Sequence, residues 1–163
     1  MKLFNSAICG SLIFLSASAG AEDYSALWFD PDYQKANVKT IQTCLKRSSD
    51  KQSCIGIKLT YEDLPNAGAY AINETSAWSF VGQQVYTSLL KKWPDKASFL
   101  KQSQLAWHDY VQKECQWQAE SSTYSDDDQY GNHIAYYDRV AISSCINGFT
   151  QQRVVSLHVD SIY

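Results

Sequence analysis

The chain has 163 residues, with 14 lysines and arginines against 17 acidic residues, and a formal net charge of −3. A chain of this length can bury the core of one domain without the help of a metal ion. A mildly acidic balance argues against nucleic acid or an anionic membrane as a partner, because both attract basic proteins.

The first residues have the three parts of a secretory signal peptide. Lys2 supplies the positive start, residues 3–15 are mostly apolar, and small residues follow at Ala17-Ser18-Ala19 and Ala19-Gly20-Ala21. The apolar run is too short to span a bilayer. We therefore expect residues 1–19 to be a signal peptide, with cleavage after Ala19 or Ala21.

The product expected from this cleavage is a soluble periplasmic or secreted protein with one domain over residues 22–163. Removal of the one signal-peptide lysine leaves 13 basic against 17 acidic residues, a net charge of −4. Cys9 leaves with the signal peptide. Four cysteines remain, and an even number in an exported chain is typical of two disulfides.

Helical signals begin at Asp30-Pro31, where Asp is suited to the N-cap and Pro to the first turn. This first helix is expected to run to Arg47. A weakly patterned stretch follows, and a second helix is expected from near Asn73 to Trp93, before the break at Pro94-Asp95. Its apolar stripe holds Trp78, Val81, Val85, Leu89 and Trp93.

A third helix is expected after Asp95, which is a suitable N-cap. Its stripe is Leu100, Gln104, Trp107, Val111 and Cys115. The polar loop from Glu120 to Gly131 has turn residues and no period. In the last helix we expect an inward face of Tyr137, Ala141, Ser144, Cys145, Gly148, Gln152 and Val155. The pattern predicts an all-α, small antiparallel bundle of about four helices.

Four cysteines allow three pairings. Cys44 and Cys54 flank a short turn and would form a local clip, whereas a bridge between Cys115 and Cys145 would join the last two helices. Gly148, one turn after Cys145, is expected to permit a close helix approach. Free or metal-bound thiols are the alternative, but the chain has no Cys-x-x-Cys, and its histidines do not stand at ligand spacing from the cysteines: His108, His133 and His158. We expect no metal and no cofactor.

Catalytic motifs are not found in the sequence. There is no G-x-S-x-G, no H-E-x-x-H and no Gly-rich phosphate loop. His108 and Asp109 are adjacent on a helix and point in different directions. Asp126, Asp127 and Asp128 do not alternate as calcium ligands do. An enzyme is therefore disfavoured, and a protein-binding function is favoured.

Aromatic residues number 22 in the chain. Those at helical spacing are most simply core: Trp78, Trp93, Trp107, Tyr110 and Tyr137. The polar loop instead combines tyrosines with carboxylates, a composition typical of recognition surfaces. We expect the partner-binding residues there, with a merely solvated connection as the alternative: Glu120, Tyr124, Asp126, Asp127, Asp128, Tyr130 and His133.

Gln104 is the polar member of the stripe in the third helix. A buried amide without partners costs about 1–3 kcal/mol. Arg153, one turn after Thr150, can donate to the amide oxygen. We therefore expect Gln104 to face the core and Arg153 to bind it, in a network that is structural.

The pattern of these residues resembles the LprI-type lysozyme inhibitor family. The family's Leu-x-x-x-Gln-x-x-Trp helix, two cysteines and Thr-x-x-Arg fall on Leu100, Gln104, Trp107, Cys115, Cys145, Thr150 and Arg153. One branch of the family also has the stretch that stands here as Cys44, Leu45, Cys54, Ile55 and Gly56, and a helix matched by Glu74, Trp78, Tyr86 and Leu89. The resemblance covers roughly residues 41–157.

This sequence departs from that branch at two further cysteines, which are both missing between Cys54 and Trp78. Their joint absence is consistent with a lost disulfide and leaves the pairs Cys44–Cys54 and Cys115–Cys145. The resemblance implies an exported, non-enzymatic protein that binds and blocks a lysozyme-like muramidase. The alternative is a non-inhibitory envelope protein-interaction or immunity-like factor.

Overall fold

The computed structural model describes residues 30–60, 67–122 and 131–162, and the regular structure within these ranges is helical. The elements are α2 (Pro31–Arg47), η1 (Lys51–Cys54), α3 (Ala67–Lys92), η2 (Pro94–Lys96), α4 (Ala97–Ser122) and α5 (Gly131–Ile162). The predicted all-α bundle of four helices is confirmed. The expected signal peptide lies outside the described residues. None of the described helices is long and apolar enough to cross a membrane.

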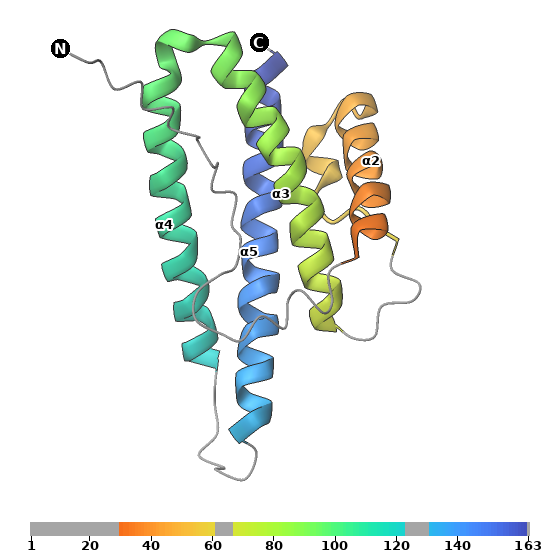
Figure 1. The fold of residues 1–163 in the computed structure, drawn as a ribbon, viewed down its shortest axis with the longest axis vertical. Helices are drawn as coiled ribbons and strands as arrows, with labels where there is room; N and C mark the ends of the chain where they lie inside the picture. The colour runs from red at the N-terminus through yellow and green to blue at the C-terminus, as the bar shows by residue number, and fades with distance from the viewer. Residues whose placement is uncertain (1–29, 61–66, 123–130, 163) are drawn as a thin grey trace, which may run out of the picture.

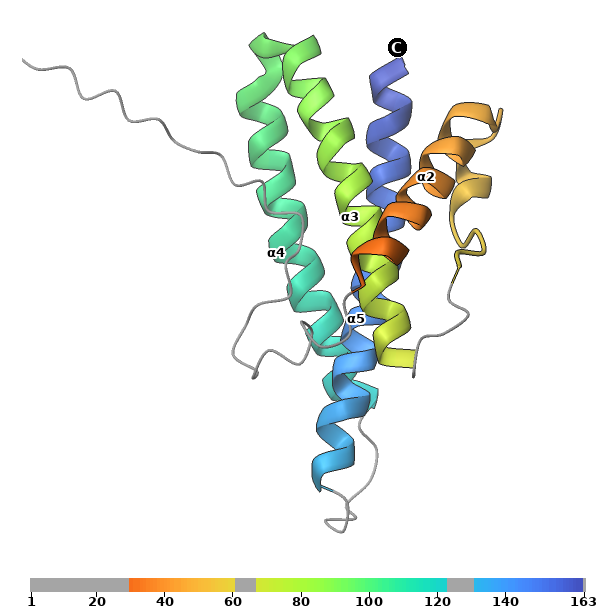
Figure 2. The ribbon, with the colours of Figure 1, turned by 45° about the vertical axis from the view of Figure 1, so that its right-hand side comes forward.

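Helix α5 lies at the centre of the bundle, with α4 on one side and α3 on the other (Figure 1). Helix α4 forms a hairpin with each of them and runs antiparallel to both. Helix α2 packs on α3 and runs in the same direction (Figure 2). The α2–α3 register is fixed by two amide hydrogen bonds between residues 42 positions apart, Gln34 Nε2 to Ser76 Oγ at 2.6 Å and Gln42 Nε2 to Gln84 Oε1 at 2.7 Å.

Helix α2 begins where the sequence predicts. Asp30 is the N-cap, and its side chain accepts hydrogen bonds from the backbone N–H groups of Asp32 and Tyr33. The backbone N–H of Asp30 in turn donates to Asn73 Oδ1 at 3.0 Å, which ties the start of α2 to α3. Lys46 and the neighbouring arginine in the last turn complement the helix dipole.

Two predicted helix starts are wrong. Helix α3 begins at Ala67, about two turns before Asn73, because the alanine-rich residues after the Pro-Asn pair are good helix formers. Asp95 is not the N-cap of α4, since it lies inside the 3₁₀ turn η2, and α4 begins at Ala97. Proline at position 94 therefore starts this turn rather than directly preceding the long helix.

The main core lies between α2, α3 and α5, around the fully buried Trp78. A second cluster near the α3–α4 turn is built on Tyr86, Leu89 and Leu157. A third joins α4 to α5 and is described with the candidate surface below. The buried members of the main cluster are Val38, Ile41, Leu45, Cys54, Leu59, Ala77, Trp78, Val81, Val154 and Val155.

Both predicted disulfides are present. Cys44 and Cys54 are joined with their Cα atoms 5.9 Å apart, and Cys115 and Cys145 with theirs 5.6 Å apart. The first bond clips η1 to the last turn of α2. The second cross-links α4 to α5. Each closes a loop, which lowers the entropy of the unfolded chain, and the 30-residue separation of the second makes its effect the larger.

The inward face predicted for α5 is partly wrong. Ala141, Ser144 and Gln152 are exposed, and Cys145 lies at the edge of the buried face. The prediction centred the face on this cysteine, whereas α5 must cover α3 as well as α4, so its buried surface is broader and turned toward α3. The buried residues are Ile146, Asn147, Thr150, Gln151, Val154, Val155 and Leu157.

Gly148 does not serve a close helix approach, contrary to expectation. A Cβ atom built at this position would meet no atom within 4 Å. The position lies in the middle of α5, where glycine is about 1 kcal/mol less favourable than alanine.

Gly148→Ala should therefore raise the free energy of unfolding by about 1 kcal/mol and Tm by about 2–4 °C. Thermal unfolding followed by circular dichroism measures the change. A lower Tm would mean that the backbone at this position approaches another element more closely than the structure shows.

A polar network joins the segment after η1 to α3 and α5. Gln151 Nε2 donates to Glu74 Oε1 at 3.2 Å, and Gln151 Oε1 accepts from the backbone N–H of Gly56 at 2.8 Å. Gly56 has a φ of 72°, which glycine adopts without strain. Burial raises the pKa of Glu74, against the opposing effect of hydrogen bonds from Asn147 and Gln151. Asn147 Oδ1 is buried, without a hydrogen-bond partner in the described part of the chain.

This network predicts a specific pH dependence. Because the pKa of Glu74 is raised on folding, the native state holds more protons than the unfolded state once the pH exceeds about 4.5, the ordinary value. The free energy of unfolding contributed by this group then falls as the pH rises from there through the raised pKa.

Glu74→Gln replaces the carboxyl group with an amide that does not ionise, so the variant does not lose free energy of unfolding at this position as the pH rises. It also adds an amide donor near Asn147. The variant should therefore gain stability relative to the wild type as the pH rises from 4 to 7. Urea unfolding at several pH values measures the difference. The exposed Asp95→Asn serves as the matched control and should keep the wild-type profile. If the stability of Glu74→Gln changed with pH in parallel with that of the wild type, the raised pKa of Glu74 would be contradicted.

Candidate protein-binding surface

Helix α4 is covered along one side. It packs against α5, and meets α3 mainly close to η2 (Figure 2). Val111 and Cys115 are fully buried against Ile146 of α5, with Trp107 and Phe149 partly buried around them. The remaining circumference of α4 faces solvent over a helix of 26 residues.

A polar network fixes α4 against α5 one turn above this cluster. Gln104 is 5% exposed, and its Oε1 accepts a hydrogen bond from Arg153 Nε at 3.3 Å, as expected from the sequence. Arg153 also donates to Ser103 Oγ at 3.0 Å, and its guanidinium lies 6.0 Å from the centre of the Trp107 ring. Burial lowers the pKa of Arg153, although the nearby Asp160 favours the charged form.

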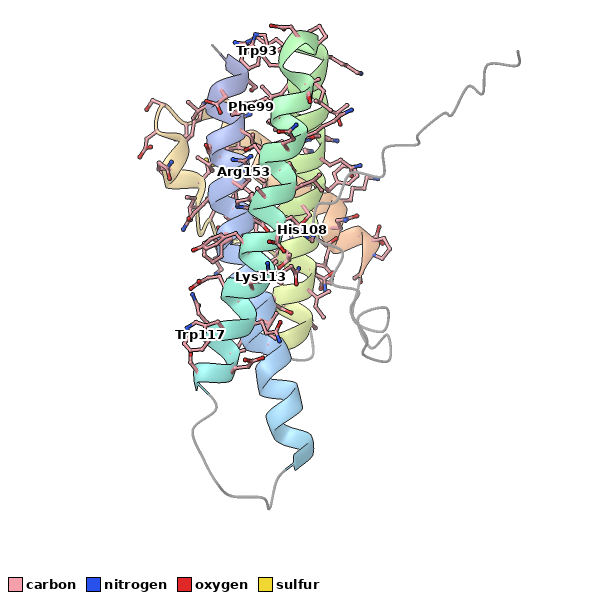
Figure 3. All side chains as sticks on the ribbon, turned by 90° about the vertical axis from the view of Figure 1, so that its left-hand side faces the viewer. Trp93, Phe99, His108, Lys113, Trp117 and Arg153 are labelled. Carbon is pink, nitrogen blue, oxygen red and sulfur yellow. A yellow bond between two sulfur atoms is a disulfide. The ribbon has the colours of Figure 1, made fainter. Side chains whose placement is uncertain are left out.

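Three large aromatic side chains of α4 are exposed on one stripe. Phe99 is 77% exposed, Tyr110 52% and Trp117 66%. Their spacings of 11 and 7 residues correspond to whole helical turns, so they share a side of the helix. Figure 3 shows Phe99 and Trp117 toward opposite ends of α4. Exposed aromatics of this size mark interaction surfaces more often than scattered small apolar residues do.

Tyr110 was expected in the core because of its helical spacing, and this expectation is wrong. Its ring stands edge-on to Phe149 of α5, with centroids 5.7 Å apart, and the rest of the side chain is open to solvent. The stripe of Leu100, Gln104 and Val111 already fills the buried side, and Tyr110 lies roughly a third of a turn away from it. The sequence contained the signal, since Phe99, Tyr110 and Trp117 form their own periodic set.

The end of α4 that bears Trp117 carries carboxylates, and we call it the acidic end. From Glu114 to Asp138 the chain has six carboxylates and neither lysine nor arginine. The structure places two of these carboxylates on α4, where Glu114 accepts from Gln118 at 2.9 Å and Glu120 from Gln116 at 2.8 Å. These two acids flank Trp117 in the sequence and lie within the last three turns of the helix.

Glu120 lies in the last turn of α4, where the helix dipole disfavours a negative charge. The last turn of α4 contains no basic residue to compensate it. A charge placed against the dipole costs a few tenths of a kcal/mol, up to about 1 kcal/mol. The helix dipole therefore does not account for this residue.

The structure describes only part of the predicted binding loop. Glu120 is exposed at the end of α4. His133 belongs to the first turn of α5, and its side chain lies outside the described part of the structure. The other predicted residues lie outside the described ranges: Tyr124, Asp126, Asp127, Asp128 and Tyr130. Trp117 was missed by the sequence analysis, because only aromatics inside the loop were considered as surface residues.

A shallow recess between α3 and α5 holds the raised-pKa carboxylate Glu74. Tyr70, Ser144 and Asn147 also line it. Glu74 is the one carboxylate among its lining residues, and its oxygen accepts from the amide of Gln151. In the described ranges no three histidine, cysteine or acidic residues are grouped as metal ligands. The recess therefore fits a structural network better than a pair of catalytic acids.

Comparison with known proteins identifies one family. The sequence model described as lysozyme inhibitor LprI matches residues 68–157, which run from the start of α3 almost to the end of α5. No curated protein and no solved structure matches. The match contains Gln104, Cys115, Cys145 and Arg153, the residues that hold α4 against α5, and leaves out α2 and the Cys44–Cys54 clip. Because it covers more than half of the chain, this protein belongs to the LprI lysozyme inhibitor family.

Proposed function

We propose that this protein is exported and that it binds and inhibits a lysozyme-like muramidase. The match to the LprI family carries the proposal. The two disulfides support an oxidising compartment outside the cytoplasm, periplasmic or extracellular. Inhibition would be steric and would need no catalytic group, cofactor or metal in this chain.

The acidic end of the bundle is the surface proposed to meet the enzyme. Glu114 and Glu120 place negative charge there, although the net charge of the whole chain is only −3. A basic muramidase would be steered toward this end, which raises the association rate at low salt. Glu114 and Glu120 belong to this surface, and the acidic loop from Tyr124 to Tyr130 continues it in the sequence.

Trp117 is proposed as the apolar anchor of the interface. It is 66% exposed between the two carboxylates, and a large aromatic surrounded by polar groups is the usual composition of an interaction hot spot. The base beneath it is rigid, because Cys115, two residues earlier, is fully buried and bonded to Cys145. Presenting the anchor from a rigid helix lowers the entropy lost on binding.

The central test is inhibition by the purified chain from residue 22 to 163. At an equimolar dose it should slow the lysis of cell walls by a basic lysozyme, measured as the fall in turbidity. No effect on c-, g- or i-type lysozymes at tenfold excess would overturn the proposal. Binding without inhibition would favour the alternative, a non-inhibitory envelope interaction or immunity-like factor.

Trp117→Ser should weaken binding by about 2 kcal/mol or more, roughly 30-fold, as expected for a hot-spot aromatic. Calorimetric titration with the lysozyme measures the affinity. Phe99→Ser is the matched control, since it removes an equally exposed ring from the other end of the same helix. Equal losses in both variants would show that Trp117 is not the anchor.

Glu114→Gln with Glu120→Gln should slow association and flatten its dependence on salt, because both charges add to the steering potential. Stopped-flow kinetics between about 20 and 200 mM salt measures the slope. The pair Asp32→Asn with Asp95→Asn removes the same charge from exposed positions elsewhere and should leave the slope nearly unchanged. If both double variants flattened the dependence of the association rate on salt, the rate would depend on the net charge of the chain and not on the position of the carboxylates.

A further inference from the structure

The turn between α3 and α4 forms the end of the bundle opposite to the acidic one (Figure 1). Residues 91–101 contain four lysines and one acid, Asp95, and all five side chains are exposed. Among the described residues, Asp160 near the end of α5 is a second carboxylate at this end, because Lys92 Nζ donates to the backbone carbonyl of Ser161 at 2.8 Å. We call residues 91–101 the basic turn; its lysines are Lys91, Lys92, Lys96 and Lys101.

The helix dipole accounts for only two of the four lysines in the basic turn. Lys91 and Lys92 lie in the last turn of α3, where the dipole favours cations. Lys96 lies directly before the first turn of α4, where the dipole disfavours a cation, and Lys101 is the fifth residue of α4, beyond the turn in which the dipole acts. In the described part of the chain neither forms an ion pair with a carboxylate, since the one such pair is Lys113 with Asp109. Neither a favourable helix dipole nor an ion pair among the described residues therefore accounts for these two lysines.

Apolar side chains accompany these lysines. Phe99 is 77% exposed, the most exposed large apolar side chain in the described ranges. The Trp93 ring is only partly buried, and the Nζ atoms of Lys92 and Lys96 lie 4.7 and 5.5 Å from its centre. Figure 3 shows Trp93 and Phe99 near the same end of the molecule. An exposed aromatic in the same short segment as several lysines is the pattern of segments that rest on a charged apolar boundary.

We propose that the basic turn binds the surface of an anionic phospholipid membrane, with the lysines on the lipid phosphates and Phe99 in the headgroup region. The membrane is the partner that fits the shape. A turn of 11 residues at a convex end is too small for a stable protein interface, which needs about 20–30 residues on each side. A membrane accepts a convex tip, and each lysine near it contributes about fivefold in affinity.

The charge of the whole chain predicts the opposite, because an acidic protein should avoid an anionic membrane. The fold removes this objection by separating the charges. The basic turn and the acidic end lie at opposite ends of α4, whose 26 residues span about 39 Å. That distance is several times the Debye length of about 8 Å at physiological salt, so the acidic end does not repel the membrane effectively. A protein bound in this way would present Trp117 and its carboxylates away from the lipid.

Vesicle co-sedimentation tests the proposal without any lysozyme, so its outcome is independent of inhibitory activity. The mature chain is mixed with vesicles of phosphatidylcholine alone or with about 30% phosphatidylglycerol, at several salt concentrations. Binding should occur only to the anionic vesicles and should weaken as salt rises. Lys96→Gln with Lys101→Gln should lower the partition coefficient about 25-fold.

Two further variants locate the contact. Phe99→Ser should weaken binding severalfold and make the remainder more sensitive to salt, because it removes the apolar part of the contact. Lys35→Gln with Lys39→Gln removes two exposed lysines from the first half of α2 and should change binding little. Circular dichroism confirms that each variant is folded.

The proposal is overturned if anionic and neutral vesicles bind equally, or if the α2 control pair loses as much binding as the pair in the basic turn. It is also overturned if the protein binds soluble polyphosphate but not the vesicles, which would assign the lysines to a polyanion. The expected result is binding to anionic vesicles that depends on Lys96, Lys101 and Phe99 together.

Discussion

The rest of the structure depends on α5, because this one helix packs against both α3 and α4. Its wide buried face, which includes Asn147, Thr150 and Gln151, is turned toward α3, while Ile146 and Arg153 contact α4. Because α5 provides the common core, α4 needs only one buried side of its own. The other side of α4 is thereby left for charges and aromatic rings that have no part in the packing.

Arg153 is the point at which this arrangement is most sensitive. Its guanidinium is taken partly out of water and is compensated by Gln104, Ser103 and the face of the Trp107 ring. Charged groups in such positions need several partners at once, since the loss of one leaves a desolvated donor. Gln104 Nε2 is itself buried without a partner in the described residues, so the network is satisfied on the arginine side and incomplete on the amide side.

The features that the sequence predicted well are those with local or covalent causes. Asp30 and Pro31 predicted the start of α2, the spacing of Leu100 to Cys115 predicted the buried side of α4, and the two disulfides followed from cysteine positions next to turns and helices. The burial of Gln104 was predictable because it lies on the periodic stripe of α4, and Arg153 was predicted as its partner because its side chain can donate to the amide oxygen.

What the sequence did not reveal depends on neighbours distant in the chain. Tyr110 and Trp117 have the same spacing as core aromatics, and only the position of α5 decides that they face solvent. The phase of α5 was misjudged because buried amides such as Gln151 look like surface residues until their partners, Glu74 and Gly56, are placed. The separation of charge between the two ends is invisible in the net charge, because it arises from the direction in which each helix runs.

The one-sided packing of α4 also has an evolutionary consequence. Substitutions on its outer side, at Phe99 or Trp117 for example, remove no buried surface and break no hydrogen bond of the core. Stability therefore does not constrain these positions, and they can change without the compensating mutations that a core position requires. A scaffold built in this way can acquire a new target by altering one face of one helix, while the helices beneath it keep the same residues.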